Sequence, residues 1–242
     1  MNEQGPDRTL IEVAIERLSA DIVSGALQPG RKLLIAELKK RYEIGASPLR
    51  EALAKLSSDG FVVFDSRRGF RVAEVSQADL EDITRVRKSI ECEALKSAIA
   101  NGDDEWDVGI VAASARLHRL AVRAREADPP TGTDVERAHR QFHTALLAAC
   151  DSPRLLSLQQ LFYDQAQRYR AVMMRQWHGL DEAAEVHQQL ADVVLSRDVD
   201  RACSALSEHI DLTLQSVYPE GADGVRPHTN AEPKSRRNRQ LA

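Results

Sequence analysis

Nine residues, from Gly45 to Leu53, constrain the fold of this chain most, because they combine a turn, a helix start and a helical apolar spacing. Gly45 suits a tight turn, the Ser47 hydroxyl can cap a helix, and Pro48 fits the first helical position, where no backbone donor is needed. The apolar face that follows consists of Leu49, Leu53 and Leu56. Arg50 points away from that face, in the first turn, where side chains of a helix in the DNA major groove meet base edges or phosphates. A Ser-Pro start also occurs in helices that touch no DNA, so the neighbouring elements must decide.

The neighbouring elements predict a winged helix-turn-helix over residues 9–75. Thr9 and Glu12 have capping-box spacing and open a first helix that Gly25 ends. A short second helix runs to about Tyr42, directly before the turn that opens the third. Two helices that meet across a tight connection are the basis of this DNA-binding unit.

A β-hairpin follows the third helix and supplies the wing. The segments 61–64 and 70–72 have strand character. The hairpin tip consists of Arg67, Arg68 and Gly69. Cationic side chains beside a glycine suit close approach to phosphate, and a solvated turn is the alternative for the tip taken alone.

Positive charge is concentrated in this same region. The formal net charge of the chain is −4, yet residues 31–71 contain ten Lys or Arg against five Asp or Glu. A local basic surplus of this kind fits a polyanion such as double-stranded DNA, whereas any single one of these charges is as well explained by a solvated surface. The residues that we expect to contact DNA are Arg31, Ser47, Pro48, Arg50, Arg67, Arg68 and Gly69.

The sequence carries no sign of export or of a membrane partner. Its amino terminus is polar, and no apolar run approaches the length of a membrane span. The three cysteines are far apart and lie among helical apolar residues, which favours reduced thiols in packing roles. We therefore expect a cytoplasmic protein.

The second half of the chain is predicted to be an all-α bundle of about six helices, so the fold class is mainly α. The expected helices lie at about 77–100, 104–126, 133–150, 152–177, 181–196 and 198–217. We place this domain at residues 76–218. Residues 1–8 are expected to form a flexible amino terminus, and residues 219–242, which are polar and rich in Gly, Pro and Arg, a disordered basic tail.

Four histidines of this second domain are candidate metal ligands. His139 and His143 are spaced i, i+4, which turns both rings to one side of a helix. His187 and His209 each share a stripe with apolar residues and should face the bundle interior. Taken singly, each is as well explained as a hydrogen-bonded core residue. Arg87 lies on the apolar side of its helix and is expected to point inward.

These residues together resemble the GntR superfamily of bacterial transcription regulators, in the FadR branch with the all-helical FCD effector domain. The match covers nearly the whole chain. Its amino-terminal motif is visible in Gly25 to Gly30, in Ser47 to Leu53, and in the wing residues Gly69 and Val72. The resemblance implies that Arg50 contacts DNA and that the Gly69 turn approaches it. Ala46 stands where many members carry a guanine-reading arginine, so their operator preference does not transfer.

The same resemblance implies a divalent metal, with zinc or nickel favoured. Metal-binding members of this branch use one carboxylate and three histidines. Here His139 stands at the carboxylate position, and the other ligand positions correspond to His143, His187 and His209. An imidazole in place of a carboxylate leaves a bound ion with one more net positive charge, which favours an anionic effector, or means that no metal binds.

The chain is also similar to a subgroup that represses glutarate and related dicarboxylate catabolism. This resemblance implies a small dicarboxylate effector, which the cationic side chains Arg87 and Arg168, with Tyr169 beside them, are expected to bind. The sequence thus predicts a homodimeric repressor that releases operator DNA when a metabolite binds its helical domain.

Two alternatives stay open. In one, the histidines and Arg87 bind the effector without any metal. The other is a metal-dependent enzyme, which is disfavoured because four imidazoles fill a tetrahedral shell and no His-Glu-x-x-His motif is present.

Overall fold

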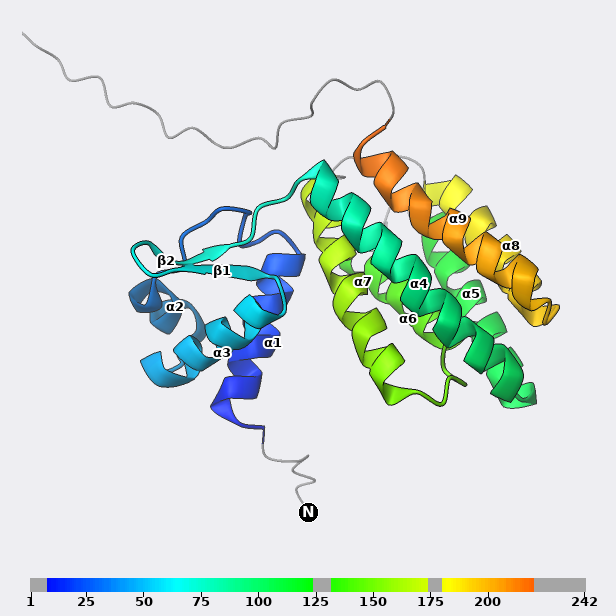
Figure 1. The fold of residues 1–242 in the computed structure, drawn as a ribbon, viewed down its shortest axis with the longest axis horizontal. Helices are drawn as coiled ribbons and strands as arrows, with labels where there is room; N and C mark the ends of the chain where they lie inside the picture. Colours follow the sequence, from blue (N-terminus) through cyan, green and yellow to red (C-terminus); the bar gives the residue numbers. More distant parts are fainter. Residues whose placement is uncertain (1–7, 124–131, 174–179, 220–242) are drawn as a thin grey trace, which may run out of the picture.

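The computed structural model describes residues 8–123, 132–173 and 180–219. Two lobes lie side by side, an amino-terminal lobe with a small hairpin and a carboxyl-terminal lobe built of helices (Figure 1). The mainly α fold class is thereby confirmed. The predicted flexible amino terminus and the predicted basic tail fall almost entirely outside the described residues.

The amino-terminal lobe is a winged helix-turn-helix. Its elements are α1 (Leu10–Val23), α2 (Ile35–Tyr42), α3 (Ala46–Ser58), β1 (Val62–Asp65) and β2 (Gly69–Val72). The predicted capping box opens α1, since the Thr9 hydroxyl accepts from the Glu12 backbone and the Glu12 carboxylate accepts from the Thr9 backbone. The predicted apolar face of α3 is buried, with Leu49, Leu53 and Leu56 at most 1% exposed.

The start of α3 differs from the expectation. The helix begins at Ala46 with Gly45 as its N-cap, and the Ser47 hydroxyl, already inside the helix, donates to Glu51 at 3.2 Å. Pro48 is therefore the third helical residue, where its missing N–H still costs no intrahelical bond. Gly45 has φ −62°, and the left-handed residue of this turn is Glu43, with φ 58°. The left-handed residue that reverses the chain direction, Glu43, therefore lies directly after the end of α2.

The hairpin forms the wing as predicted, with Val62 opposite Val72 and Asp65 opposite Gly69. The Asp65 carboxylate accepts from the backbone N–H groups of Arg67 at 2.8 Å and Arg68 at 3.1 Å, which lowers the pKa of that carboxyl. Gly69 has φ +77°, a conformation that other residues adopt only with strain.

A third chain segment pairs with the wing, and sequence inspection did not find it. The Leu33 N–H donates to Phe70 at 2.9 Å, and the Val72 N–H donates to Arg31 at 2.9 Å. Residues 31–33 therefore extend the hairpin on its β2 side. This pairing places Arg31 at the base of the wing.

The carboxyl-terminal lobe is a helical bundle, as predicted. Its helices are α4 (Gln77–Asn101), α5 (Asp104–Arg123), α6 (Gly132–Leu146), α7 (Pro153–Met173), α8 (Leu180–Leu195) and α9 (Val199–Val217). α4 packs on α7 and α9, while α5 packs on α6 and α8. The predicted extensions of α5 and α7 to about residues 126 and 177 lie outside the described residues. Within the described ranges, no helix combines the length and apolar character needed to cross a membrane.

Helix α7 joins the two lobes. Leu161 packs against the apolar core of the winged lobe. The Gln165 amide donates to the Asp59 carbonyl at 2.7 Å. That carbonyl precedes Gly60, where a β-carbon would lie 2.9 Å from the Gln165 amide nitrogen. The end of α3 and the side of α7 are therefore in close contact.

Candidate metal centre and nucleic-acid interface

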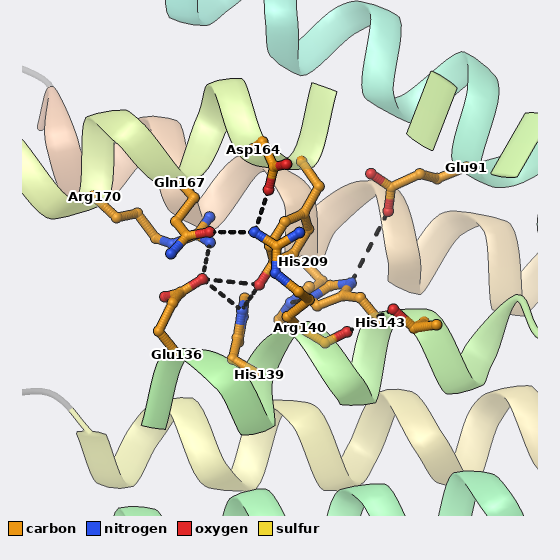
Figure 2. Close-up of polar contacts among 11 residues, drawn as sticks. Glu91, Glu136, His139, Arg140, His143, Asp164, Gln167, Arg170 and His209 are labelled. Carbon is orange, nitrogen blue, oxygen red and sulfur yellow. Dashed lines mark hydrogen bonds and ion pairs between the residues drawn. The ribbon is translucent and has the colours of Figure 1, made fainter. Parts of the chain in front are cut away.

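Four imidazole rings from three helices meet inside the carboxyl-terminal lobe. His139 and His143 come from α6, His187 from α8 and His209 from α9. One ligand atom of each lies within 4.8 Å of the others, and all except His139 are buried. Figure 2 shows His139, His143 and His209 directed into this shared space. The structure thus brings together all four histidines that the sequence singled out.

Hydrogen bonds orient His139. Its Nδ1 lies 2.5 Å from the Tyr163 hydroxyl, which donates to Glu136 at 2.9 Å. Because that hydroxyl has one proton, a neutral His139 must donate from Nδ1. Its Nε2 then keeps a free lone pair for an ion.

A carboxylate, that of Glu91, lies near the Nδ1 side of the His143 ring. His143 Nδ1 lies 4.0 Å from Glu91 Oε2, beyond hydrogen-bond distance, and neither atom has a hydrogen-bond partner among the described residues. A carboxylate behind an imidazole is a common arrangement in metal centres, since it orients the ring and raises its basicity. The opposite nitrogen, His143 Nε2, lies 3.2 Å from Nε2 of His209.

The donor set fits a transition-metal ion. Two nitrogens bound to one tetrahedral Zn²⁺ are about 3.3 Å apart, given Zn–N bonds of about 2.0 Å. The His143–His209 spacing of 3.2 Å matches this edge. Burial lowers the pKa of His139, His143 and His209 well below the usual value, and the neighbouring histidines and arginines lower it further. The rings are therefore neutral, which is the form that binds metal.

Three arginines and three carboxylates surround the ring of Tyr163. The guanidinium carbons of Arg87, Arg140 and Arg170 lie 5.4, 4.8 and 5.2 Å from its centroid. Each arginine has an acidic partner, as Figure 2 shows for two of them. The ion pairs are Arg87 with Glu91 at 2.7 Å, Arg170 with Glu136 at 2.7 Å, and Arg140 with Asp164. Burial raises the pKa of Tyr163 well above its usual value, so the phenol stays neutral.

This polar cluster retains unused hydrogen-bond capacity. Nε and Nη1 of Arg170 are buried without a hydrogen-bond partner among the described residues. Glu136 and Tyr163 raise the pKa of Arg170 despite its burial, so the group is charged. Because the three ion pairs already balance, a divalent ion held by four neutral imidazoles would add two uncompensated positive charges.

The structure places the three expected effector residues, Arg87, Arg168 and Tyr169, in two different surroundings. Arg87 points inward, 3% exposed, as predicted. Arg168 instead donates to the carbonyls of Ala73 and Glu74 at 3.4 Å, and the Tyr169 hydroxyl bonds to Asp79. Both side chains therefore hold the segment that joins the lobes.

The α7 side chains that do reach the histidines are Tyr163 and Arg170, neither of which sequence reasoning selected. Their i, i+7 spacing places them on one helix face. Arg168 and Tyr169 differ from Arg170 by one or two positions and therefore lie on other faces.

The expected DNA-contacting residues lie on exposed parts of the winged lobe. Arg50 is exposed on α3, and within the described ranges its guanidinium has neither a hydrogen bond nor an ion pair. Arg67 and Arg68 are exposed at the wing tip, and the space around the missing β-carbon of Gly69 is open to 4 Å. Arg31 is exposed at the base of the wing, 3.8 Å from Glu37. These cations are thus available to an external anion.

Comparison with known proteins supports these two units. Residues 10–72 match the family described as bacterial regulatory proteins, gntR family, and residues 82–212 match the FCD domain. The chain belongs to the GntR family. It is 36% identical to the HTH-type transcriptional regulator BphR of Paraburkholderia xenovorans over 88% of this chain and 87% of the relative. It is 35% identical to the HTH-type transcriptional repressor GlaR of Escherichia coli over 80% of this chain and 89% of the relative.

A solved structure shares the fold. The GntR chain described here aligns with E. coli McbR/YncC at a TM-score of 0.75 and 20% identity, over 88% of this chain and 98% of the other. The family and its relatives are DNA-binding transcriptional regulators and not enzymes, so the metal-dependent enzyme is set aside.

The buried Arg87–Glu91 pair gives a prediction about stability. Arg87→Met should lower the free energy of unfolding by about 3 to 5 kcal/mol, because it leaves a buried carboxylate without its partner. Arg85→Met is the matched control, since Arg85 pairs with Asp82 on the exposed side of the same helix. Its effect should stay within about 1 kcal/mol. Urea denaturation measures both, and equal losses would contradict the prediction.

Proposed function

We propose that this GntR-family regulator is a homodimeric repressor. It dissociates from operator DNA when a small dicarboxylate binds beside a metal ion in its helical lobe. The observation that carries the proposal is the position of α7, which contacts the histidine cluster through Tyr163 and the winged lobe through Gln165. A site buried in one lobe thereby adjoins the DNA-binding lobe.

DNA binding is assigned to α3 and the wing. Arg50, which is exposed and has no hydrogen-bond or ion-pair partner in the part of the chain that the structure describes, would contact base edges in the major groove. The wing tip, with Arg67 and Arg68, would contact phosphates, which fix position without reading sequence. Two such lobes in a dimer would occupy two half-sites of a pseudo-palindromic operator.

The metal is assigned to His139, His143, His187 and His209. An all-imidazole set favours zinc or nickel over magnesium or calcium, which prefer oxygen ligands. The ion supplies positive charge at the centre of the lobe. The residues around it would hold the imidazoles in place, with Tyr163 behind His139 and Glu91 behind His143.

A dicarboxylate is the effector that this charge distribution favours. The two surplus positive charges of an ion on four neutral imidazoles equal the charge of one fully ionised diacid. Arg170 offers two buried N–H donors to a carboxylate, and the Arg87 guanidinium lies 5.4 Å from the centroid of the Tyr163 ring. Glutarate is the probe of choice, given the subgroup that the sequence resembles.

Release from DNA would act through α7. An effector that binds one arrangement of the lobes more tightly than the other shifts the equilibrium by that difference in affinity. Arg170 and Tyr163 would sense the ligand, while Leu161, Gln165 and Arg168 on the same helix hold the winged lobe and its connection. The shift would change the spacing of the two α3 helices in the dimer.

The DNA assignment predicts that Arg50→Ala weakens operator binding. The loss should be about 1 to 3 kcal/mol, or about 5-fold to 150-fold in affinity, if the guanidinium reads a base. The probe is a duplex selected by the wild-type protein from a randomised pool, titrated by fluorescence anisotropy. Arg154→Ala, an exposed arginine on α7, should leave affinity unchanged. Unchanged affinity for Arg50→Ala would exclude this role.

The metal assignment predicts about one zinc or nickel ion per chain in protein purified without an affinity tag. His143→Ala and His209→Ala should lose it, because each removes one of four ligands. His118→Ala, an exposed histidine of α5, is the control that should keep it. Elemental analysis measures all three. Absence of metal from wild-type protein that still responds to effector would instead support the metal-free pocket.

The effector assignment predicts that glutarate raises the melting temperature of the protein. A ligand that binds only the folded form stabilises it, by about 2.7 kcal/mol at one hundred times Kd. Arg170→Met should lose the shift, and Arg168→Met, which alters a contact with the inter-lobe segment, should keep it. Chelator treatment should reduce the shift in wild type. A screen in which succinate, glutarate and adipate all fail to shift the transition would contradict a dicarboxylate effector.

A further inference from the structure

The outer face of α5 is apolar where it meets solvent. Val108 is 67% exposed, Val111 54% and Val122 46%. These are three of the nine large apolar side chains that are strongly exposed in the described ranges. Valine is also a poor choice for an exposed helix position on propensity grounds, because its branched side chain loses rotamer freedom there. The stripe therefore has no evident role in stabilising the helix itself.

Small residues lie between these valines and leave room for close approach. Gly109, Ala112 and Ala115 are exposed, and nothing lies within 4 Å of a β-carbon built on Gly109. An open groove of about 670 Å³ runs beside them, between Ala112 and Ala115 of α5 and Gln188 of α8. Helices pack most closely where the facing side chains are small. The centre of this face can therefore accept another helix.

Charges at the two ends of α5 have opposite sign. Asp104 and Glu105 are exposed in its first turn, and Arg116 and Arg119 are exposed in its second half. Within the described residues, none of these four has a hydrogen bond or an ion pair. The helix dipole favours such a distribution in any helix, but it does not account for exposed valines between the two ends.

We propose that this α5 face, defined by Val108, Val111, Ala112, Ala115 and Val122, is the surface through which two copies of the chain pair. This inference rests on the proposed homodimeric function and assigns its interface. Two α5 helices that cross antiparallel on a two-fold axis bring each acidic end beside the basic end of the partner helix. The valines then meet across the small central residues. Such self-complementarity is what an isologous interface requires.

The first test changes the centre of the face. Val111→Glu in the full chain should convert the wild-type dimer into monomer at micromolar concentration, measured by sedimentation velocity, because it places two carboxylates in an apolar seam. Leu158→Glu is the matched control, since Leu158 is 42% exposed on α7. Circular dichroism establishes that each variant is folded. A folded Val111→Glu chain that stays dimeric overturns the proposal, as does dissociation by Leu158→Glu alone.

The second test uses charge and does not depend on one substitution being tolerated. Variant one carries Asp104→Lys and Glu105→Lys, and variant two carries Arg116→Glu and Arg119→Glu. Each should dimerise at least 10-fold more weakly than wild type, since like charges then face each other. A mixture of the two should form heterodimers, because a basic α5 then faces an acidic one. Failure of the mixture to associate overturns the antiparallel pairing.

These outcomes separate the interface from the proposed function. A wild-type dimer that binds the selected duplex, together with a dimeric Val111→Glu variant, overturns only the α5 surface. A monomeric wild-type chain that binds the duplex overturns both the homodimer and the surface. A dimer that is broken by Val111→Glu but shows no salt-dependent duplex binding in either form supports the surface and overturns the DNA role.

Discussion

Burial of a polar cluster is the constraint on which the carboxyl-terminal lobe depends. Four imidazoles share a space in which their ligand atoms lie within 4.8 Å of one another, inside a bundle whose other contacts are mainly apolar. Unpaired polar groups are costly in such surroundings. The ion pairs Arg140–Asp164 and Arg170–Glu136 join α6 to α7, and Arg87 of α4 lies against the ring of Tyr163, so these contacts oppose relative movement of the three helices. The same contacts hold the rings ready for an ion.

Helix α7 contacts the histidine cluster with one face and the winged lobe with another. Tyr163 and Arg170 lie on the face toward the histidines, while Leu161, Gln165 and Arg168 contact the winged lobe or its connection. A rigid element that contacts both sites is one physical means of coupling between them. Because α7 contacts the end of α3 directly, this one helix connects the histidine cluster to the DNA-binding helix.

Local patterns predicted much of this structure. The i, i+4 spacing of His139 and His143, and the apolar stripes around His187 and His209, correctly placed all four rings in the bundle interior. The winged unit was equally accessible, because its capping box, apolar spacing and hairpin are short-range signals. The start of α3 was wrong by two residues, since Gly45 can itself serve as the N-cap and leaves Ser47 without a capping bond.

Long-range packing explains what the sequence did not reveal. Arg168 and Tyr169 were expected at the effector site because of the resemblance to dicarboxylate-responsive regulators, yet successive residues of a helix point about 100° apart, so these side chains and that of Arg170 lie on different faces. Only the packing of α7 against α6 shows that Arg170 meets Glu136. The pairing of residues 31–33 with β2 depends on a contact across almost forty positions, for which no local pattern exists.

The inward contacts of α7 also limit how such a chain can be rearranged in evolution. One extra residue between Leu161 and Arg170 would rotate one face of the helix by about 100° relative to the other and shift it by about 1.5 Å. When a winged lobe is exchanged between regulators, the residues of α7 that contact it must therefore keep their helical register, although α7 belongs to the other lobe. A chimera joined within residues 73–76 would inherit a foreign surface at Gln165, so the natural seam for domain shuffling includes part of α7.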